Sequence, residues 1–376
     1  GLAHVDVSIK DNTQGNNAYR KGVVAVLGIT ERGTPRTPTL VRSWTEFQRF
    51  YGGYSNWSLF PLYCKRALDA GATLLVSRAA HYTDITDTST LEGTAAISTY
   101  TYPTWGVHLE AADFGLWGNK LSVDILAASS GVMGNVDIAV YYEGNSELNY
   151  IVKDISVNPT TDEINNFNQR SRLVKLISFY GNLEPAVGLQ FNFGMELYTN
   201  MSQEDFKGDA SNGTGFHAFD DNSEHVRLAI FEPKGYPEVL LADLTAYCEA
   251  RNIMGVMPTP MFTTGYNAID FRNFTGVYNI GMPAVSSWKV RLLYGDLQIL
   301  HPQTNRPIVL HCIADWVGAM AKKDSTSGVW FSESGTVRGK VSNTHGVIYN
   351  LGTRQSEGNE VDAAGINICK TSSSFG

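Results

Sequence analysis

The chain has 376 residues, of which 43% are hydrophobic and only 18% are charged, and its formal net charge at pH 7 is -8. This balance excludes a disordered chain, which would carry few apolar residues and many charges. Lysine and arginine form no block along the sequence, so nothing indicates a protein that binds a nucleic-acid backbone. A chain of this length predicts two or three domains.

Cysteine usage and targeting signals bear on the compartment in which the chain is made. The four cysteines are widely spaced, with no CxxC pair, at Cys64, Cys248, Cys312 and Cys369. We expect buried free thiols in a chain made in a reducing cytosol.

Glycosylation sequons begin at Asn56, Asn200, Asn212 and Asn273. About four should occur by chance in a chain of this composition, so they do not indicate secretion. No signal peptide opens the sequence and no apolar run is long enough for a membrane span, while a first residue other than methionine suggests a processed, cut or recombinant chain.

The first 80 residues have the pattern of an α/β sheet. A polar arm or edge segment, residues 1–20, precedes a continuous apolar run at 23–29 that predicts a strand buried on both faces. Ser43 and Glu46 have the spacing of a capping box, which predicts a helix that ends at Gly52-Gly53. A further helix and strand are expected at 59–70 and 73–79.

The pattern changes between residues 81 and 225, where Thr, Ser and Tyr are frequent and helical periodicity is rare. Strands are expected at 121–126, 136–142, 150–157 and 172–179, with a short helix at 162–168. Such spacing is typical of an antiparallel β region. Residues 181–222 are rich in glycine and are expected to form a long irregular surface loop.

The α/β pattern then returns. An apolar strand is expected at 226–231, a helix that begins at Pro237, and another strand at 253–257. Further strands are expected at 288–293, 297–300 and 308–310, and a helix at 313–321. We therefore predict an α+β, multidomain protein. Residues 21–80 plus 226–376 would form one discontinuous α/β domain, into which a mainly antiparallel β-sandwich or barrel, residues 81–225, is inserted.

Signals of chemistry are weak. The sequence contains no P-loop, dinucleotide-binding, nucleophile-elbow or HExxH motif. His311 and Asp315 lie four residues apart on a predicted helix, a spacing that more often gives a local hydrogen bond than a site. A polar cluster that could bind a cation comprises Asp220, Asp221, Glu224 and His225, but a solvated loop is the favoured interpretation. We expect no catalytic residue, no cofactor and no metal.

Five short segments, in their order along the chain, carry a family resemblance. They are 28–33 leading to Glu46, Phe47, Gly52 and Gly53; 71–78; 115–123 with Trp117, Gly118 and Asn119; 168–174 with Arg172 and Leu173; and 363–367 with Gly365, Ile366 and Asn367. In this order they resemble motifs of contractile tail sheath proteins, from bacteriophages and related injection systems. Two segments, 310–324 and 327–332, depart from the family pattern, so the resemblance does not say which system the chain comes from. Family members continue beyond the equivalent of Gly376 into a C-terminal domain and an arm that pairs with neighbours, so we expect the chain to be a fragment.

The resemblance implies a structural role. Sheath subunits stack as rings, usually six-fold, around a tail tube, and they contract to drive the tube through the target cell envelope for genome ejection. It implies as partners other sheath subunits, the tail tube protein, and the baseplate and tail terminator proteins, with no direct nucleic-acid contact and no membrane insertion. The protein would be part of the virion, assembled in the host bacterial cytoplasm, with residues 81–225 exposed on the outside of the sheath. Two alternatives remain: a hydrolase or transferase that uses His311 and Asp315, and a secreted β-rich adhesin.

Overall fold

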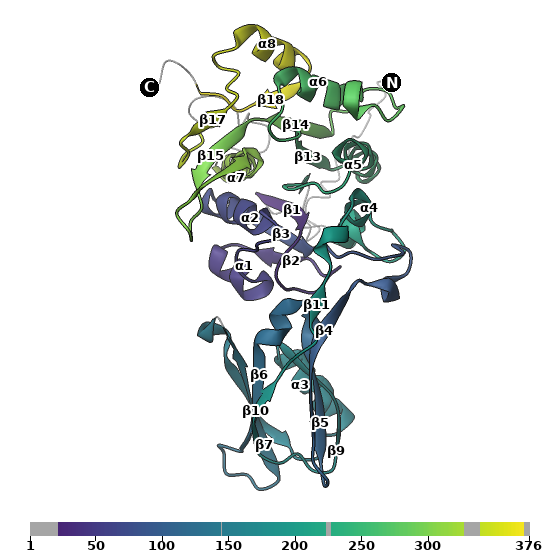
Figure 1. Cartoon of the computed structure of the whole chain (residues 1–376), viewed down its shortest axis with the longest axis vertical. Helices are drawn as coiled ribbons and strands as arrows, with labels where there is room; N and C mark the ends of the chain where they lie inside the picture. Colours follow the sequence, from purple (N-terminus) through teal and green to yellow (C-terminus); the bar gives the residue numbers. More distant parts are fainter. Residues whose placement is uncertain (1–21, 144, 223–226, 327–338, 372–376) are drawn as a thin grey trace, which may run out of the picture.

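The computed structural model describes residues 22–143, 145–222, 227–326 and 339–371. The expected arm at 1–20 and the segment 327–332 lie outside the described residues. The molecule is elongated: a sheet with its covering helices lies at one end, and a β sandwich lies at the other (Figure 1). The segments 22–80, 227–326 and 339–371, purple and green to yellow in Figure 1, share the sheet end.

A seven-stranded sheet takes its strands from both ends of the described chain. Its order is β18-β14-β13-β12-β1-β3-β2. The strands are β1 (Val23–Gly28), β2 (Thr39–Val41), β3 (Thr73–Arg78), β12 (Arg227–Ala229), β13 (Met254–Pro258), β14 (Val290–Tyr294) and β18 (Ile366–Ile368). All neighbours pair in parallel except β2, which is antiparallel to β3. In the centre, Ala25 of β1 is in register with Leu75 on one side and Leu228 on the other.

The continuous apolar run of β1 follows from its position between two cores. Val23, Ala25 and Leu27 face a core shared with α5 (Pro237–Arg251), α6 (Gly265–Asn273) and α8 (Gln355–Ala363). Val24 and Val26 face a second core shared with α1 (Trp44–Tyr51), α2 (Phe60–Asp69) and α7 (Ile313–Thr326). A strand covered by helices on both faces can carry no polar side, which is why this run does not alternate. A small antiparallel sheet, β16-β15-β17, lies beside the second core and comprises β15 (Asp296–Leu300), β16 (Pro307–His311) and β17 (Gly346–Ile348).

The sandwich consists of two antiparallel four-stranded sheets, β10-β6-β7-β8 and β11-β4-β5-β9. Its elements are β4 (Gly93–Thr101), β5 (Gly106–Phe114), β6 (Leu121–Ala127), β7 (Asn135–Tyr142), β8 (Tyr150–Ser156), α3 (Thr161–Arg170), β9 (Val174–Tyr180), β10 (Ala186–Gln190) and β11 (Met195–Glu196). Alternate residues such as Val107 and Leu109 of β5 pack with Val123 and Ile125 of β6 in one core. Burial with a period of two is typical of a strand that packs on one face, and it is also seen in β5, where no strand is expected from the sequence.

The α+β, multidomain character expected from the sequence is confirmed. The expectation of an irregular loop at 181–222 is wrong. That stretch contains β10, β11 and α4 (Gln203–Lys207), and its aromatic residues Phe206, Phe216 and Phe219 are buried in the core beside β1. Buried apolar residues at irregular spacings fix the position of this glycine-rich segment without giving it a helical or strand period.

Candidate functional site

A buried polar network joins the sheet end of the molecule to the sandwich. Arg78, the last residue of β3, is only 1% exposed. Its guanidinium donates to the carbonyl oxygens of Gly33 at 3.2 Å and Phe114 at 3.0 Å, and it lies 3.8 Å from the centroid of the Phe114 ring. Phe114 ends strand β5 of the sandwich. One arginine therefore holds the ends of two strands from the two parts of the molecule.

A carboxylate and a phenol complete the environment of Arg78. Its Nη2 atom lies 3.2 Å from Oε2 of Glu196 and donates to the hydroxyl of Tyr198 at 2.6 Å. The Tyr198 hydroxyl in turn donates to the carbonyl of Thr30, just after β1, at 2.6 Å. Burial raises the pKa of Glu196, an effect that the charge of Arg78 opposes. A buried guanidinium with this many partners acts as a structural clamp.

Glu31 forms a second connection across the same junction. Its carboxylate accepts the N–H of Gly53 at 3.1 Å and the hydroxyl of Tyr142, the last residue of β7, at 3.0 Å. Lys120 of the sandwich approaches the same carboxylate at 3.5 Å. The end of helix α1 and the sandwich are thus attached to one side chain in the loop after β1.

Gly52 and Gly53, both expected from the family motif, have different reasons to be glycine. Gly52 caps α1 with φ +88° and ψ -167°, a conformation that is essentially restricted to glycine. A Cβ atom there would also lie 2.7 Å from Cβ of Glu31. At Gly53 a Cβ atom would meet nothing within 4 Å, and its N–H is what Glu31 binds.

Trp117, Gly118 and Asn119 lie at the sandwich side of the junction. The indole of Trp117 is 2% exposed and donates to the Phe114 carbonyl at 3.0 Å, the same oxygen that Arg78 binds. A Cβ atom on Gly118 would lie 2.7 Å from that of Ala96. The amide of Asn119 binds both backbone groups of Gly194, which precedes β11, at 2.7 and 3.0 Å.

Glu46 and Phe47 lie on α1, where the expected capping box is only half formed. Ser43 Oγ accepts the N–H of Glu46 at 3.2 Å, as predicted. The Glu46 carboxylate accepts the N–H of Arg42 at 2.7 Å instead of that of Ser43, so it reaches one residue further back than the box requires. Phe47 is fully buried and stacks on Trp44 with ring centroids 5.1 Å apart.

The remaining motif positions do not belong to this junction. Leu173 is buried and its carbonyl accepts the N–H of Ala112 inside the sandwich, whereas Arg172 is exposed. Gly365 has φ +77° after α8, Ile366 is buried, and Asn367 donates to the Leu292 carbonyl at 3.3 Å. The motif residues are thus structural positions spread over the fold. Glu31 and Arg78 lie in the segments 28–33 and 71–78 but are not among the expected motif positions, and both contact the sandwich.

His311 and Asp315 do not form a pair. His311 is 1% exposed, and burial lowers its pKa to about 3, so the imidazole is neutral at pH 7. Asp315 instead makes a double ion pair with Arg66 of α2, at 2.6 and 3.1 Å. The partner of Asp315 is therefore a distant residue and not the local hydrogen bond expected from the spacing.

The acidic cluster before β12 is only partly visible, because Glu224 and His225 lie outside the described residues. Asp220 pairs with His217 and accepts from the Tyr247 hydroxyl, each at 2.8 Å, and Asp221 is exposed. Within the described ranges no group of three or more His, Cys, Asp or Glu residues could hold a metal ion. Nor does any described helix have the length and apolar character needed to cross a membrane.

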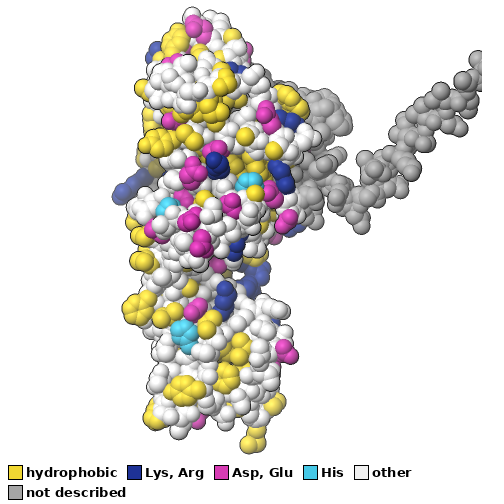
Figure 2. Space-filling view, turned by 90° about the vertical axis from the view of Figure 1, so that its right-hand side faces the viewer, with side chains coloured by type: hydrophobic (Ala, Val, Ile, Leu, Met, Phe, Trp, Pro, Cys, Tyr) yellow, Lys and Arg dark blue, Asp and Glu magenta, His cyan; other side chains and the backbone are white. Residues whose placement is uncertain are grey.

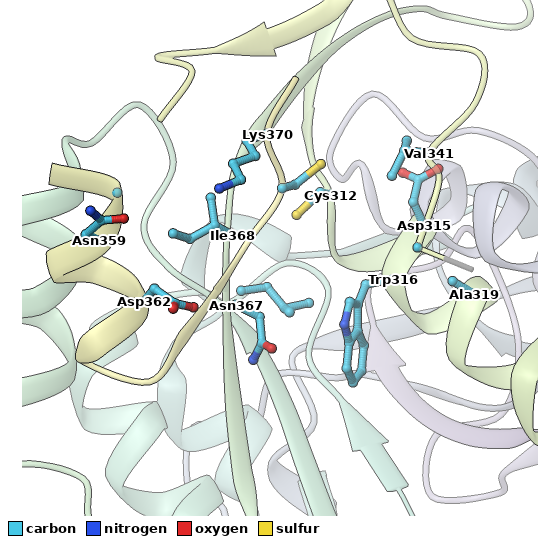
Figure 3. Close-up of a pocket in the computed structure, with 14 residues that line it drawn as sticks. Cys312, Asp315, Trp316, Ala319, Val341, Asn359, Asp362, Asn367, Ile368 and Lys370 are labelled. Carbon is cyan, nitrogen blue, oxygen red and sulfur yellow. The ribbon is translucent and has the colours of Figure 1, made fainter. Parts of the chain in front are cut away.

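A cavity of about 290 Å³ lies between α7, α8 and β18 (Figure 3). Its lining includes Cys312, Asp315, Trp316, Asp362, Asn367 and Cys369. On the face seen in Figure 2, acidic and basic side chains are interspersed and form no large patch of one sign. These features give no catalytic constellation.

Solved structures with the same fold are sheath tail proteins. The sheath tail protein of Listeria innocua aligns with a TM-score of 0.62 and 13% identity, over 94% of this chain and 66% of its own. That of Desulfitobacterium hafniense aligns with a TM-score of 0.52 and 14% identity, over 98% of this chain and 72% of its own. No protein-family model and no curated protein matches the sequence. The chain thus spans just under two thirds of the length of the Listeria protein, and across nearly all of its own length it has the fold of the sheath tail proteins.

Proposed function

We propose that this protein is a structural subunit of a contractile tail sheath. The observation that carries the proposal is the alignment of 94% of the chain with one sheath tail protein at a TM-score of 0.62. The five motif segments, which resemble the same family in the same order, support it independently of the fold.

In this proposal the subunits stack as six-fold rings around a tail tube and contract to drive the tube through a cell envelope during genome ejection. Their partners are other copies of this chain, the tube protein, and the baseplate and tail terminator proteins. Identical subunits joined by a heterologous contact that does not close generate a helical array of this kind. The protein belongs to the virion tail and assembles in the host cytoplasm.

The junction network fits a part that moves as one body. Contraction requires subunits to exchange one set of mutual contacts for another while each keeps its own fold. Arg78 and Glu31 attach the sandwich to the sheet with a buried and a partly buried polar contact, so a force on one part reaches the other. We propose that residues 21–80 plus 226–376 form the domain that mediates ring contacts, and that residues 81–225 project outward.

An enzyme is the weaker candidate. His311 is enclosed and uncharged, and Asp315 is committed to Arg66, so neither is placed to act on a substrate. No specific observation favours a secreted adhesin.

The test is assembly of the whole gene product, alone and together with the tube protein of the same particle. We expect it to sediment as a large polymer that is visible by negative stain as a hollow cylinder, with the tube protein alone as the control. A product that stays monomeric in both mixtures would contradict the proposal.

A further inference from the structure

Two of the four cysteines are held by the carbonyl groups of two consecutive residues, Tyr294 at the end of β14 and Gly295 directly after it. The N–H of Cys369, directly after β18, donates to the carbonyl of Tyr294 at 2.8 Å. The N–H of Cys312, directly before α7, donates to the next carbonyl, that of Gly295, at 2.9 Å. The backbones of two residues that are 57 positions apart are thus fixed on consecutive carbonyl groups.

The side chains converge at the same place. A Cβ atom built on Gly295 would lie 2.9 Å from Cβ of Cys369, and Sγ of Cys312 lies 3.7 Å from the Tyr294 carbonyl oxygen. The two thiols are close enough for each to shift the pKa of the other. Disulfide formation requires side chains that face each other with Cβ atoms about 3.5–4.5 Å apart. The Tyr294 and Gly295 carbonyls hold both cysteines at one point between β18 and α7, which favours such an approach.

Of the four cysteines, Cys369 is the one that is partly exposed, whereas Cys312 is buried. Both line the cavity between α7, α8 and β18, and Cys369 is only partly buried (Figure 3). Cys64 and Cys248 are fully buried in the two cores. The interaction between the two thiols lowers the pKa of Cys369 and raises that of Cys312. Because the thiolate is the reactive form, Cys369 is the nucleophile of the pair.

We propose that Cys312 and Cys369 form a redox-active pair, which a peroxide converts to an intramolecular disulfide that fastens β18 to the start of α7. The inference does not depend on the proposed function. It changes the expectation of four buried free thiols, since two of them form a modification site. The bond would close the segment from 312 to 369 and restrain the edge strand of the seven-stranded sheet.

The chemistry balances with hydrogen peroxide as the oxidant. The Cys369 thiolate attacks one oxygen of the peroxide, the O–O bond breaks, and Cys369 becomes a sulfenic acid while hydroxide leaves and takes up a proton. The Cys312 sulfur then attacks the sulfenyl sulfur, the S–S bond forms, and a second hydroxide leaves with the proton that Cys312 gives up. Two thiols and one peroxide give one disulfide and two waters.

The test is mass spectrometry of the full chain after peroxide treatment and alkylation of the remaining thiols. We expect a linked peptide that contains Cys312 and Cys369, formed at least about tenfold faster than any oxidation of Cys64 or Cys248. The unfolding midpoint temperature should rise by several degrees and return when dithiothreitol is added.

The matched control is Cys369→Ser, which replaces a partly exposed residue. Its midpoint under reducing conditions should equal that of the unmodified chain, which shows that it folds, and peroxide should not raise it. The proposal is overturned if Cys369 is oxidised to sulfinic acid without a linked peptide. It is also overturned if the disulfide joins two chains, or if Cys64 and Cys248 are oxidised as fast as Cys312 and Cys369.

Discussion

Arg78 and Phe114 end strands in different parts of the molecule and lie against each other: the guanidinium carbon is 3.8 Å from the ring centroid and an Nη atom is 3.0 Å from the Phe114 carbonyl oxygen. The same carbonyl accepts the indole N–H of Trp117. A sheet strand, a sandwich strand and the turn that carries the Trp-Gly-Asn motif therefore meet at one oxygen atom. This relationship accounts for why an arginine can be buried at the end of β3.

Replacement of Arg78 should be the most damaging single change at the junction. Arg78→Met leaves the carboxylate of Glu196, which is 7% exposed, without its cation, and loss of one partner from a buried pair costs roughly 3–5 kcal/mol. The measurement is the free energy of unfolding in urea. The control is Arg172→Met on the sandwich surface, expected to change stability by at most about 0.5 kcal/mol. Equal losses of unfolding free energy in the two variants would show that the Arg78 network does not stabilise the junction.

The adjacent glycines at the end of α1 should respond very differently to alanine. Gly52→Ala places a Cβ atom against Glu31 in a backbone conformation that alanine avoids, so we expect a loss of about 1–3 kcal/mol. Gly53→Ala meets no atom within 4 Å and should be within about 0.5 kcal/mol of the parent chain. Thermal unfolding of both variants measures the difference. If Gly53→Ala is the worse of the two, the described cap geometry is wrong.

The buried imidazole of His311 predicts a pH dependence. Burial lowers its folded-state pKa to about 3, below the ordinary value of about 6.5 that it regains on unfolding. Between these values the unfolded state binds one more proton than the folded state, so the histidine's contribution to stability is present above about pH 6.5 and is lost as the pH falls. The stability of the parent chain should therefore decrease more steeply from pH 7 to pH 4.5 than that of His311→Gln.

The exposed His345 provides the control for this effect, since His345→Gln should retain the steep decrease of the parent chain. Urea unfolding at several pH values gives the comparison. NMR can follow the titration of each imidazole in the folded chain. A His311 imidazole that titrates near pH 6.5 would contradict its enclosed position.

The sequence predicted the elements whose periodicity is undisturbed. The apolar run of β1, Pro237 as the first residue of α5 and the alternation in β6 each follow from local rules, and the structure has them. It did not predict β10 or the burial of Phe206 and Phe216, because the contacts that fix them come from distant strands and leave no local period.

The candidate site shows the same limit. Glu31 and Arg78 could be read only as parts of motif segments, because their roles depend on Tyr142 and Phe114, which are 111 and 36 residues away. The spacing of His311 and Asp315 indicated a local pair, whereas Asp315 pairs with Arg66, 249 residues away. Charges that pair across the fold cannot be matched from one sequence, since each acidic residue has many possible partners.

In the proposed function, this chain builds the outer cylinder of a contractile tail. Immunogold electron microscopy of particles from producing cells, with polyclonal antibody against the purified chain, tests it most directly. We predict gold along the full length of a striated cylinder, which becomes shorter and wider in contracted particles. Gold confined to the baseplate or the inner tube, or antibody that binds no particle, would contradict the account.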